Sequence, residues 1–391
     1  MSVLTTKNTQ RVLIVTGEPS GDLHAANMIQ AARVINPGLS FFGVTGPKMR
    51  AAGCETLLSY DEISVMGFVE VIGRLPAIRR AFKTVTATFL DERRPDLLVL
   101  VDFPGFNMRL ARAAKKAGIP VLYYIAPKVW AWRQGRAKTL AATVDRMAVI
   151  FPFEPEFYRP YGLQADYVGN PLLDDYAASQ KVKADLNGLN ETAGEQIVGL
   201  FPGSRRSEIR YNLDTMLQAA RLLSANRPEL KFILPLASSL DRTEITAQIN
   251  ASGLAVEIVE NDIYTVAAAC SAVLAVSGTV TLQIALTGTP LAVMYRTSAI
   301  SAAIARQVVK IPYVSLVNII AGREVVREFL QEEATPERLA AEMSKILDDP
   351  ACKAQICAGL DEVHKLMGAP GCSLKVAGIV NEMTGESYEK S

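Results

Sequence analysis

The sequence predicts an α/β protein with two Rossmann-like domains that face each other across a cleft. Residues 11–22 and residues 197–208 each run as an apolar, β-branched strand into a turn of Gly, Pro and Ser that leads into a helix. In a parallel sheet such a turn lies at the carboxyl edge, where backbone N–H groups and the helix dipole can hold an anion. The chain of 391 residues is long enough to supply a separate sheet after each opening.

The first domain is expected within residues 1–173, where short apolar runs alternate with segments of helical period. Strands are predicted at 12–15, 41–44, 97–101, 121–125 and 147–151, and helices at 23–34, 75–89 and 108–116. This alternation is typical of βαβ units in a parallel sheet. The polar stretch at 174–195 is interpreted as the linker between the domains.

The second domain is expected within residues 196–350 and repeats the alternation. Strands are predicted at 197–201, 232–236, 256–259, 273–276 and 291–294, and helices at 211–224, 280–286 and 337–347. Two further helices, at 351–367 and 373–383, follow the last predicted strand. We expect this segment, about 351–391, to return to the first domain and complete it.

Composition excludes several classes of function. The formal net charge of +1 does not favour a nucleic-acid-binding protein. The five cysteines are scattered and form no C-x-x-C pair, which predicts reduced thiols in a cytoplasmic protein. Residues 1–10 are polar and lack an apolar stretch, so no signal peptide is expected. Because His24 and His364 are the only histidines, no metal site is predicted from spacing. No segment is apolar and long enough to predict a membrane span.

Two turns in the second domain could bind a phosphate group. The turn at 203–208 joins a strand to a helix, so its amides can bind phosphate oxygens, and Arg205 adds donors suited to a diphosphate. A second such turn, Ser277-Gly278-Thr279, lets a ligand approach the backbone closely. Gln283 is expected one turn into the following helix, within reach of a ribose hydroxyl. An ordinary helix cap is the alternative for both turns.

Three carboxylates stand at strand ends in the first domain. Glu18 and Asp22 occupy the first turn, and Asp102 ends the apolar strand at 97–101. Asp102, in such apolar surroundings, is expected to have a raised pKa and can act as a base. Glu18 could bind sugar hydroxyls or accept a proton from one. The alternative for Asp22 and Asp102 is a helix cap.

Two further segments allow a binding or a packing interpretation. The aromatic and basic residues at 123–133, with Lys128 and Trp130, could line a sugar or phosphate site or could pack between domains. The apolar segment at 63–73 is followed by Arg74, Arg79, Arg80 and Lys83. This pattern is typical of a surface that rests on an anionic membrane or receives a lipid, and a core helix is the alternative.

Eight motifs together resemble one family. They are GEPSGD at 17–22, VMGFVEV at 65–71, VDFPGFN at 101–107, IAPKVWAW at 125–132, VGNPL at 168–172, FPGSR at 201–205, SGT at 277–279 and YVSLVNIIAGREVV at 313–326. In this order they resemble the lipid-A-disaccharide synthases, inverting hexosyltransferases with the two-Rossmann fold called GT-B. The resemblance implies that UDP-2,3-diacylglucosamine is joined to 2,3-diacylglucosamine 1-phosphate (lipid X), giving the β-1,6-linked disaccharide phosphate and UDP.

The resemblance also implies roles for individual residues, with no cofactor and no metal. Asp102 is the first choice for the base, and Glu18 and Asp22 are second choices or acceptor ligands. The donor would be bound by Gly203, Ser204, Arg205, Ser277, Gly278, Thr279, Gln283, Asn318 and Arg323. The acceptor and its lipid would be bound by Ser20, Gly21, Val65, Met66, Phe68, Asn107, Lys128 and Trp130. Gln283 stands where many relatives have Glu, and Val317 and Arg327 replace expected prolines.

Other functions remain open at this point. A MurG-like transferase or a UDP-N-acetylhexosamine 2-epimerase shares the predicted fold, but neither explains the segment at 65–71 together with VDFPGFN. A nucleotide-binding module without catalysis is the rival from another class. A metal-dependent GT-A transferase is disfavoured because the chain contains no D-x-D. The expected location is the cytoplasm, peripherally at the inner face of the inner membrane, and whether the chain forms a homodimer is left open.

Overall fold

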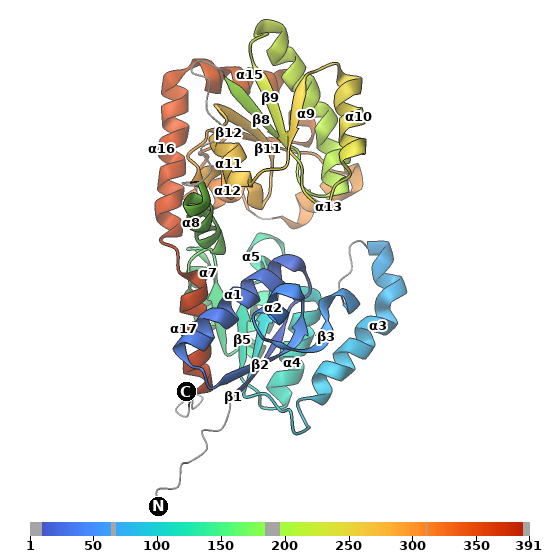
Figure 1. Cartoon of the computed structure of the whole chain (residues 1–391), viewed down its shortest axis with the longest axis vertical. Helices are drawn as coiled ribbons and strands as arrows, with labels where there is room; N and C mark the ends of the chain where they lie inside the picture. Colours follow the sequence, from blue (N-terminus) through green and yellow to red (C-terminus); the bar gives the residue numbers. More distant parts are fainter. Residues whose placement is uncertain (1–9, 64–67, 184–195, 310, 386–391) are drawn as a thin grey trace, which may run out of the picture. The chain divides into compact units, whose positions relative to one another are not determined.

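The structure is a computed structural model that describes residues 10–63, 68–183, 196–309 and 311–385. The chain divides into two compact units (Figure 1). Unit 1 consists of Met1–Pro171 with Pro370–Ser391, and unit 2 of Leu172–Ala369. Each unit has its own parallel sheet, so the predicted α/β fold with two Rossmann-like domains is confirmed.

Unit 1 is built on a seven-stranded parallel sheet with the strand order β3-β2-β1-β4-β5-β6-β7. The strands are β1 (Gln10–Val15), β2 (Leu39–Thr45), β3 (Glu55–Ser59), β4 (Leu97–Val101), β5 (Val121–Tyr124), β6 (Arg146–Val149) and β7 (Ala165–Tyr167). The helices are α1 (Pro19–Ile35), α2 (Pro47–Ala51), α3 (Phe68–Ala87), α4 (Pro104–Lys116), α5 (Val129–Trp132), α6 (Arg136–Thr143), α7 (Glu154–Tyr158) and α17 (Cys372–Thr384). Short 3-10 turns occupy Tyr60–Glu62 and Arg159–Tyr161.

Successive side chains of β1 are buried on opposite faces of this sheet, as the period of two in a strand requires. Val12 and Ile14 pack with α1, α2 and α17, whereas Leu13 and Val15 pack with α3, α4 and α6. β1 and β5 both pair with β4. The turns that follow these three strands therefore lie side by side at the carboxyl edge of the sheet.

Unit 2 is built on a six-stranded parallel sheet with the strand order β10-β9-β8-β11-β12-β13. The strands are β8 (Ile197–Phe201), β9 (Lys231–Pro235), β10 (Val256–Val259), β11 (Ala272–Val276), β12 (Leu291–Tyr295) and β13 (Glu328–Leu330). The helices are α8 (Pro171–Lys183), α9 (Arg206–Asn226), α10 (Arg242–Ser252), α11 (Ile263–Ala268), α12 (Thr279–Leu286), α13 (Ala299–Val308), α14 (Leu316–Ala321), α15 (Pro336–Asp348) and α16 (Pro350–Met367), with a 3-10 turn at Gln331–Glu333. Because β8 pairs with β11, the two predicted phosphate turns are neighbours.

The two C-terminal helices belong to different units, which differs from the expected return at about residue 351. α16 packs on α12, α14 and α15 within unit 2, and Gly359 allows this close approach because a Cβ there would lie 2.4 Å from Val325 Cγ1. α17 instead packs along α1 in unit 1, and its buried face includes Val376 and Val380. The return to unit 1 therefore begins at Pro370.

The expected linker and the sheet edges also differ from the sequence prediction. Residues 171–183, part of which was interpreted as linker, form α8, while 184–195 lie outside the described residues. The edge strands β3, β7 and β13 were not predicted. Each is short and only partly buried, so it lacks the continuous apolar run that marks the central strands.

Candidate active site

A cavity of about 400 Å³ in unit 2 opens at the carboxyl ends of β8, β9 and β11. It brings together seven residues that the sequence analysis assigned to donor binding. They are Gly203, Ser204, Arg205, Ser277, Gly278, Thr279 and Gln283. Segments some 70 residues apart in the chain meet here because β8 and β11 are neighbouring parallel strands.

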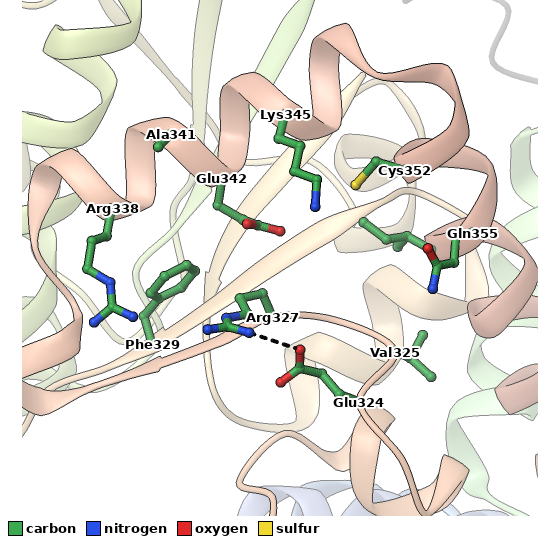
Figure 2. A pocket seen from close by; sticks show the side chains of 11 residues that line it. Glu324, Val325, Arg327, Phe329, Arg338, Ala341, Glu342, Lys345, Cys352 and Gln355 are labelled. Atoms are coloured by element: carbon green, nitrogen blue, oxygen red, sulfur yellow. Dashed lines mark hydrogen bonds and ion pairs between the residues drawn. The ribbon is translucent and has the colours of Figure 1, made fainter.

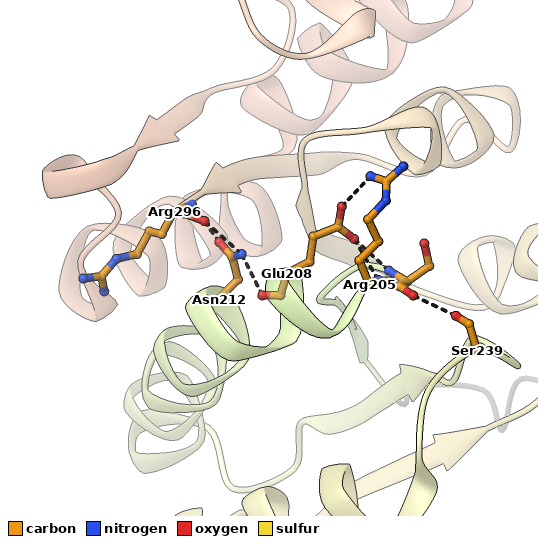
Figure 3. A network of polar contacts seen from close by, with 6 residues as sticks. Arg205, Glu208, Asn212, Ser239 and Arg296 are labelled. Carbon is orange, nitrogen blue, oxygen red and sulfur yellow. Dashed lines mark hydrogen bonds and ion pairs between the residues drawn. The ribbon is translucent and has the colours of Figure 1, made fainter. Parts of the chain in front are cut away.

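Glu208, which sequence reasoning did not single out, occupies the anion site of the first turn. Its Oε2 accepts the N–H groups of Ser204 at 2.9 Å and Arg205 at 3.2 Å, and its Oε1 lies 3.0 Å from Arg205 Nη1 (Figure 3). Gly203 has φ +103°, and a Cβ there would lie 2.2 Å from Glu208 Oε2. The turn therefore binds an anion through amides and a guanidinium, and the chain itself provides that anion.

A polar network fixes the first turn of α9 against the rest of the sheet edge. Asn212 donates to the Glu208 carbonyl at 2.8 Å and accepts the N–H of Arg296 at 2.7 Å, just after β12 (Figure 3). Ser239 Oγ donates to the Ser204 carbonyl at 2.7 Å. The geometry of the turn is thus set by Asn212 of α9 and by residues of two loops, Ser239 after β9 and Arg296 after β12, none of which was predicted from the sequence.

The second turn presents backbone rather than side chains to the cavity. Ser277 Oγ donates to the Val314 carbonyl at 2.9 Å, and no side chain caps α12 at Gly278. Gln283 lines the cavity and also hydrogen bonds to the Tyr264 hydroxyl. The amides at the start of α12 can therefore receive an anionic group, with the helix dipole adding to the attraction.

Two residues assigned to the donor by resemblance make contacts within unit 2. Asn318 is fully buried: its Nδ2 donates to the Val326 carbonyl and to Glu328 at 2.8 Å each, and its Oδ1 accepts the amides of Val325 and Val326. Arg323 is exposed and pairs with Glu362 on α16. Neither residue lines the 400 Å³ cavity of unit 2, and their assignment to donor binding stays a prediction.

In unit 1, Glu18 and Asp102 meet at the carboxyl ends of β1 and β4. Their side chains are hydrogen bonded to each other, and Asp102 is half-buried. Burial first, and then the charge and hydrogen bond of Glu18, raise the pKa of Asp102 to about 6, although the charge of Lys128 lowers it. A carboxyl group with this pKa is mostly ionised at neutral pH yet holds a proton more strongly than an exposed one, as a general base requires.

The backbone at Asp102 is strained and tightly held. Asp102 and Phe103 have φ of +45° and +48°, a region that non-glycine residues rarely adopt. The Asp102 carbonyl accepts the Tyr123 hydroxyl at 2.7 Å and Asn107 Nδ2 at 2.8 Å. Strain of this kind persists only where the surroundings fix the backbone, and it is concentrated at functional sites.

Asn107 is fully buried below this turn. Besides Asp102, its Nδ2 lies 3.3 Å from the Val101 carbonyl and 3.4 Å from the Val15 carbonyl. Its role is to join the ends of β1 and β4. Among the described residues its Oδ1 is buried without a hydrogen-bond partner, and its assignment to the acceptor stays a prediction.

Asp22 is a structural residue rather than a base. Its Oδ1 accepts the N–H groups of Gly46 and Met49 at 2.9 and 3.0 Å, and its Oδ2 accepts that of Lys48 at 2.9 Å. The side chain is only 1% exposed and caps the N-terminus of α2. Both carboxylate oxygens are thus engaged away from solvent, which corrects the second-choice assignment of Asp22 to catalysis.

Its neighbours Ser20 and Gly21 differ in their surroundings. Ser20 is exposed, and its Oγ donates to Glu18 Oε1 at 3.0 Å, so it stays beside the carboxylate pair. Gly21 is buried, and a Cβ there would lie 2.1 Å from Thr16 Oγ1. Gly21 therefore permits close packing of α1 on the end of β1.

The segment after β5 contributes a cation and a buried indole. Lys128 Nζ lies 5.8 Å from the centre of the Phe151 ring, and its charge lowers the pKa of Asp102. Trp130 is 4% exposed, and its Nε1 donates to Glu154 Oε1 at 3.1 Å. Trp130 is thus a core residue, whereas Trp132 is 44% exposed. The assignment of Trp130 to the acceptor stays a prediction.

The predicted lipid segment is only partly described. Val65 and Met66 lie outside the described residues, and Phe68 is the first residue of α3. Farther along α3, Arg79, Arg80 and Lys83 are exposed. Within the described parts of the chain, no helix is both long and apolar enough to span a bilayer.

A second cavity of unit 2, about 460 Å³, is lined by residues of β13, α15 and α16 (Figure 2). Its charges are mixed: Arg327 pairs with Glu324 at 3.3 Å, and Glu342 and Lys345 extend from neighbouring turns of α15. Because cations and anions alternate around it, this cavity has no dominant charge with which to select an anionic donor.

Comparisons with known proteins identify the family. Residues 12–369 match the family described as lipid-A-disaccharide synthetase. The lipid-A-disaccharide synthase of Syntrophotalea carbinolica is 48% identical, covering 97% of both chains, and that of Geobacter metallireducens is 46% identical, covering 96% of this chain and 98% of the relative.

Solved structures show the same fold at low sequence identity. A structure of S. aureus MnaA with UDP superposes with a TM-score of 0.64 at 12% identity, covering 98% of this chain and 99% of that one. The calicheamicin glycosyltransferase CalG4 gives 0.59 at 14%, covering 97% and 100%. Epimerases and transferases thus share this fold, and the near full-length sequence match decides between them: the chain belongs to the lipid-A-disaccharide synthase family of glycosyltransferases.

Proposed function

We propose that this protein transfers the diacylglucosaminyl group of UDP-2,3-diacylglucosamine to the 6-hydroxyl of 2,3-diacylglucosamine 1-phosphate. The acceptor oxygen attacks the anomeric carbon as the bond to UDP breaks, which inverts the anomeric centre in one displacement. The hydroxyl proton passes to the base, and UDP leaves with the electron pair of the broken bond. The products are the β-1,6-linked disaccharide phosphate and UDP.

The observation that carries this mechanism is the pairing of Asp102 with Glu18. Two carboxyl groups that share a hydrogen bond in a half-buried site do not both ionise easily, so the pair retains affinity for one more proton. We assign the base to Asp102, because its carbonyl is held by the Tyr123 hydroxyl and by Asn107 Nδ2, and we assign Glu18 to the orientation of the acceptor hydroxyl. Activity should rise as pH increases through about 6, where Asp102 loses its proton.

We propose that the donor occupies the cavity of unit 2. Its diphosphate would bind to the amides at 203–205 and at the start of α12, and Arg205 would neutralise charge that grows on UDP as the bond breaks. Glu208 holds the same amides and guanidinium in the ligand-free turn, so its carboxylate has to yield part of this site to the diphosphate. Gln283 would contact the ribose without charge.

Turnover with the two lipid substrates tests this function. The purified protein should release UDP and form the tetraacyl disaccharide phosphate when both are supplied, and UDP-N-acetylglucosamine without acyl chains should not replace the donor. Release of UDP without the disaccharide would indicate a hydrolase. Conversion of UDP-N-acetylglucosamine to its 2-epimer would instead support the epimerase alternative.

We also propose that the start of α3 contacts the inner face of the inner membrane from the cytoplasm. Both substrates carry acyl chains, and the exposed cations Arg79, Arg80 and Lys83 on α3 suit an anionic surface. Replacing Met66 and Phe68 with Ser should reduce sedimentation with phosphatidylglycerol vesicles and leave UDP binding intact. Leu374→Ser, at an exposed position of α17, is the matched control. Unchanged sedimentation of the double variant would overturn this proposal.

A further inference from the structure

We propose that the packing of the Phe103 ring on the backbone of Gly17 positions the two carboxyl groups of unit 1 for the transfer reaction. Gly17 directly precedes Glu18, and Phe103 directly follows Asp102. Gly17 and Phe103 are thus positioning residues, which act through these carboxyl groups. The inference rests on the proposed function, because it concerns the base that is assigned there.

The two turns that carry the carboxyl groups have the same local construction. Glu18 is the N-cap of α1, Phe103 is the N-cap of α4, and each is followed by a proline at the first helical position. Each helix is closed at its start by a backbone hydrogen bond, from Asp22 to the Glu18 carbonyl at 3.0 Å and from Asn107 to the Phe103 carbonyl at 3.1 Å. Because proline also fixes φ, each turn enters its helix in a fixed direction. The spacing between the turns therefore depends on the contacts that join them.

The Phe103 ring fills the space between the two turns. A Cβ at position 17 would lie nearest to Phe103 Cγ, and 2.5 and 2.6 Å from the two Cδ atoms, so the ring lies directly against the Gly17 backbone. Gly17 is buried and Phe103 is half-buried. The Phe103 ring also packs with Phe106 at 6.0 Å between ring centres, and Phe106 packs edge-on against Phe82 of α3 at 5.8 Å. The ring is thus a spacer between the end of β1 and the start of α4.

The Phe103 ring has little room to yield to a side chain at position 17. Cγ is the second atom of its side chain, so it can leave its place only by rotation about the Cα–Cβ bond or by a shift of the backbone. The backbone is constrained, because Asp102 and Phe103 have φ of +45° and +48° and the Asp102 carbonyl accepts the Tyr123 hydroxyl at 2.7 Å. A side chain at position 17 therefore either expels the ring or displaces the turn that carries Asp102.

The spacing matters because the two carboxyl groups change each other's proton affinity. Burial first, and then the charge and hydrogen bond of Glu18, raise the pKa of Asp102, whereas the charge of Lys128 lowers it. The Tyr123 hydroxyl also faces Asp102, and Ser20 Oγ donates to Glu18 Oε1 at 3.0 Å. If the turns separate, the influence of Glu18 falls with distance, and Asp102 loses its proton at a lower pH.

Gly17→Ala tests the contact by adding a single methyl group. The measurements are kcat as a function of pH with both lipid substrates and the Kd of UDP by titration calorimetry. The acid limb of the pH–rate profile should move to lower pH by about half a unit, a threefold change in proton affinity. Above the limb kcat should fall about tenfold, because the base no longer meets the acceptor hydroxyl at the required distance. The Kd of UDP should stay at the wild-type value, and an unmoved limb would overturn the inference.

Phe103→Ala removes the ring instead of the space for it, so it should move the limb in the same direction. Gly17→Ala should then have no further effect on the limb in the Phe103→Ala background, because the methyl group has no ring to displace. Equal shifts from Gly17→Ala in both backgrounds would contradict the inference. Phe103→Ala also decides the question if Gly17→Ala does not fold, since a limb that stays in place would exclude the spacer role.

Gly105→Ala is the matched control. Gly105 lies in the first turn of α4, two residues after Phe103, and no other part of the described chain would lie within 4 Å of a Cβ there. This variant should reproduce the wild-type limb and kcat, and a shift equal to that of Gly17→Ala would count against the spacer. A wild-type profile without an acid limb would instead overturn the assignment of Asp102 as the base, and absence of glycosyl transfer by the wild type would overturn the proposed function.

Discussion

The carboxyl edges of the two sheets have the same kind of strand-to-helix turn, but the polar groups that these turns carry are opposite in character. In unit 1 the turns after β1 and β4 bring together two carboxyl groups, Glu18 and Asp102, on a strained and partly buried backbone. In unit 2 the turns after β8 and β11 bring together backbone amides and Arg205 around a cavity. The same strand-turn-helix unit therefore presents carboxyl groups, which can bind a proton, at the edge in unit 1. At the edge in unit 2 it presents amides and a guanidinium, which can bind an anion.

The difference lies in which residues follow the strand. A carboxyl group beside another carboxyl group gains proton affinity, because each charge opposes the ionisation of the other. A glycine with positive φ instead turns amides toward one point, and at Gly203 that point is filled by the Glu208 carboxylate. The position of the turn at the carboxyl edge determines where the site lies, and the residues of the turn determine what it can bind.

The largest expected effect is at the unit 1 edge. Asp102→Asn keeps the shape of the side chain and removes its proton affinity, so kcat should fall by about 10²–10⁴-fold. Turnover with both lipid substrates at pH 7.5 or above, where wild-type Asp102 is ionised, measures this. Near-normal turnover would transfer the role of base to Glu18, and a large drop in melting temperature would make Asp102 mainly structural.

The next effect is at the unit 2 edge. Arg205→Ala should cost about 2–4 kcal/mol of transition-state stabilisation, measured as kcat/KM for the donor, because a charge on UDP loses its guanidinium. Arg206→Ala, one residue along and outside the lining of the cavity, is the control and should behave as wild type. Equal effects of the two variants would mean that a general loss of positive charge, not the contact, matters.

A third prediction distinguishes the roles of Asp22 and Glu18, two carboxylates of the same turn. Asp22→Ala leaves three N–H groups at the start of α2, two of them in buried hydrogen bonds, without their acceptor, so the free energy of unfolding should fall by about 2–3 kcal/mol. Glu18→Ala should have little effect on urea unfolding and a large effect on turnover. If Asp22→Ala were stable and inactive, Asp22 would belong to the catalytic group after all.

The smallest expected effect concerns Glu208, whose carboxylate occupies the anion site of the first turn in unit 2. Glu208→Gln removes a negative charge that competes with the diphosphate, so UDP should bind about fivefold more tightly, or about 1 kcal/mol. Titration calorimetry with UDP measures this directly. Weaker binding by the variant would mean that the carboxylate mainly organises the turn through its bonds to Ser204 and Arg205.

The sequence was sufficient to predict the central strands of both sheets and the two neighbouring turns of unit 2. Apolar runs such as β4 mark buried parallel strands, and strand order places the turns at 203 and 277 side by side. The sequence was insufficient to predict hydrogen bonds between a polar side chain and a residue far away in the chain. Asp22 accepts from amides more than 20 residues later, and Trp130 donates to Glu154, 24 residues later in the chain.

Buried partners of this kind are chosen by tertiary structure, so a motif alone does not separate a ligand from a cap. Asn318 is such a case: its motif resembled a binding sequence, but its four hydrogen bonds hold the backbone near 325–328. The same limit applies to the return of the chain to unit 1, because α16 and α17 both present apolar faces and only packing separates them.

Equilibrium binding of UDP to Asp102→Asn and Arg205→Ala, measured alongside wild type by titration calorimetry, tests the division of labour most directly. The account predicts that Asp102→Asn binds UDP with the wild-type Kd although its turnover is at least about 100-fold slower. It also predicts that Arg205→Ala binds UDP more weakly. Weakened UDP binding by Asp102→Asn, or wild-type UDP binding by Arg205→Ala, would contradict the separation of proton transfer in unit 1 from donor binding in unit 2.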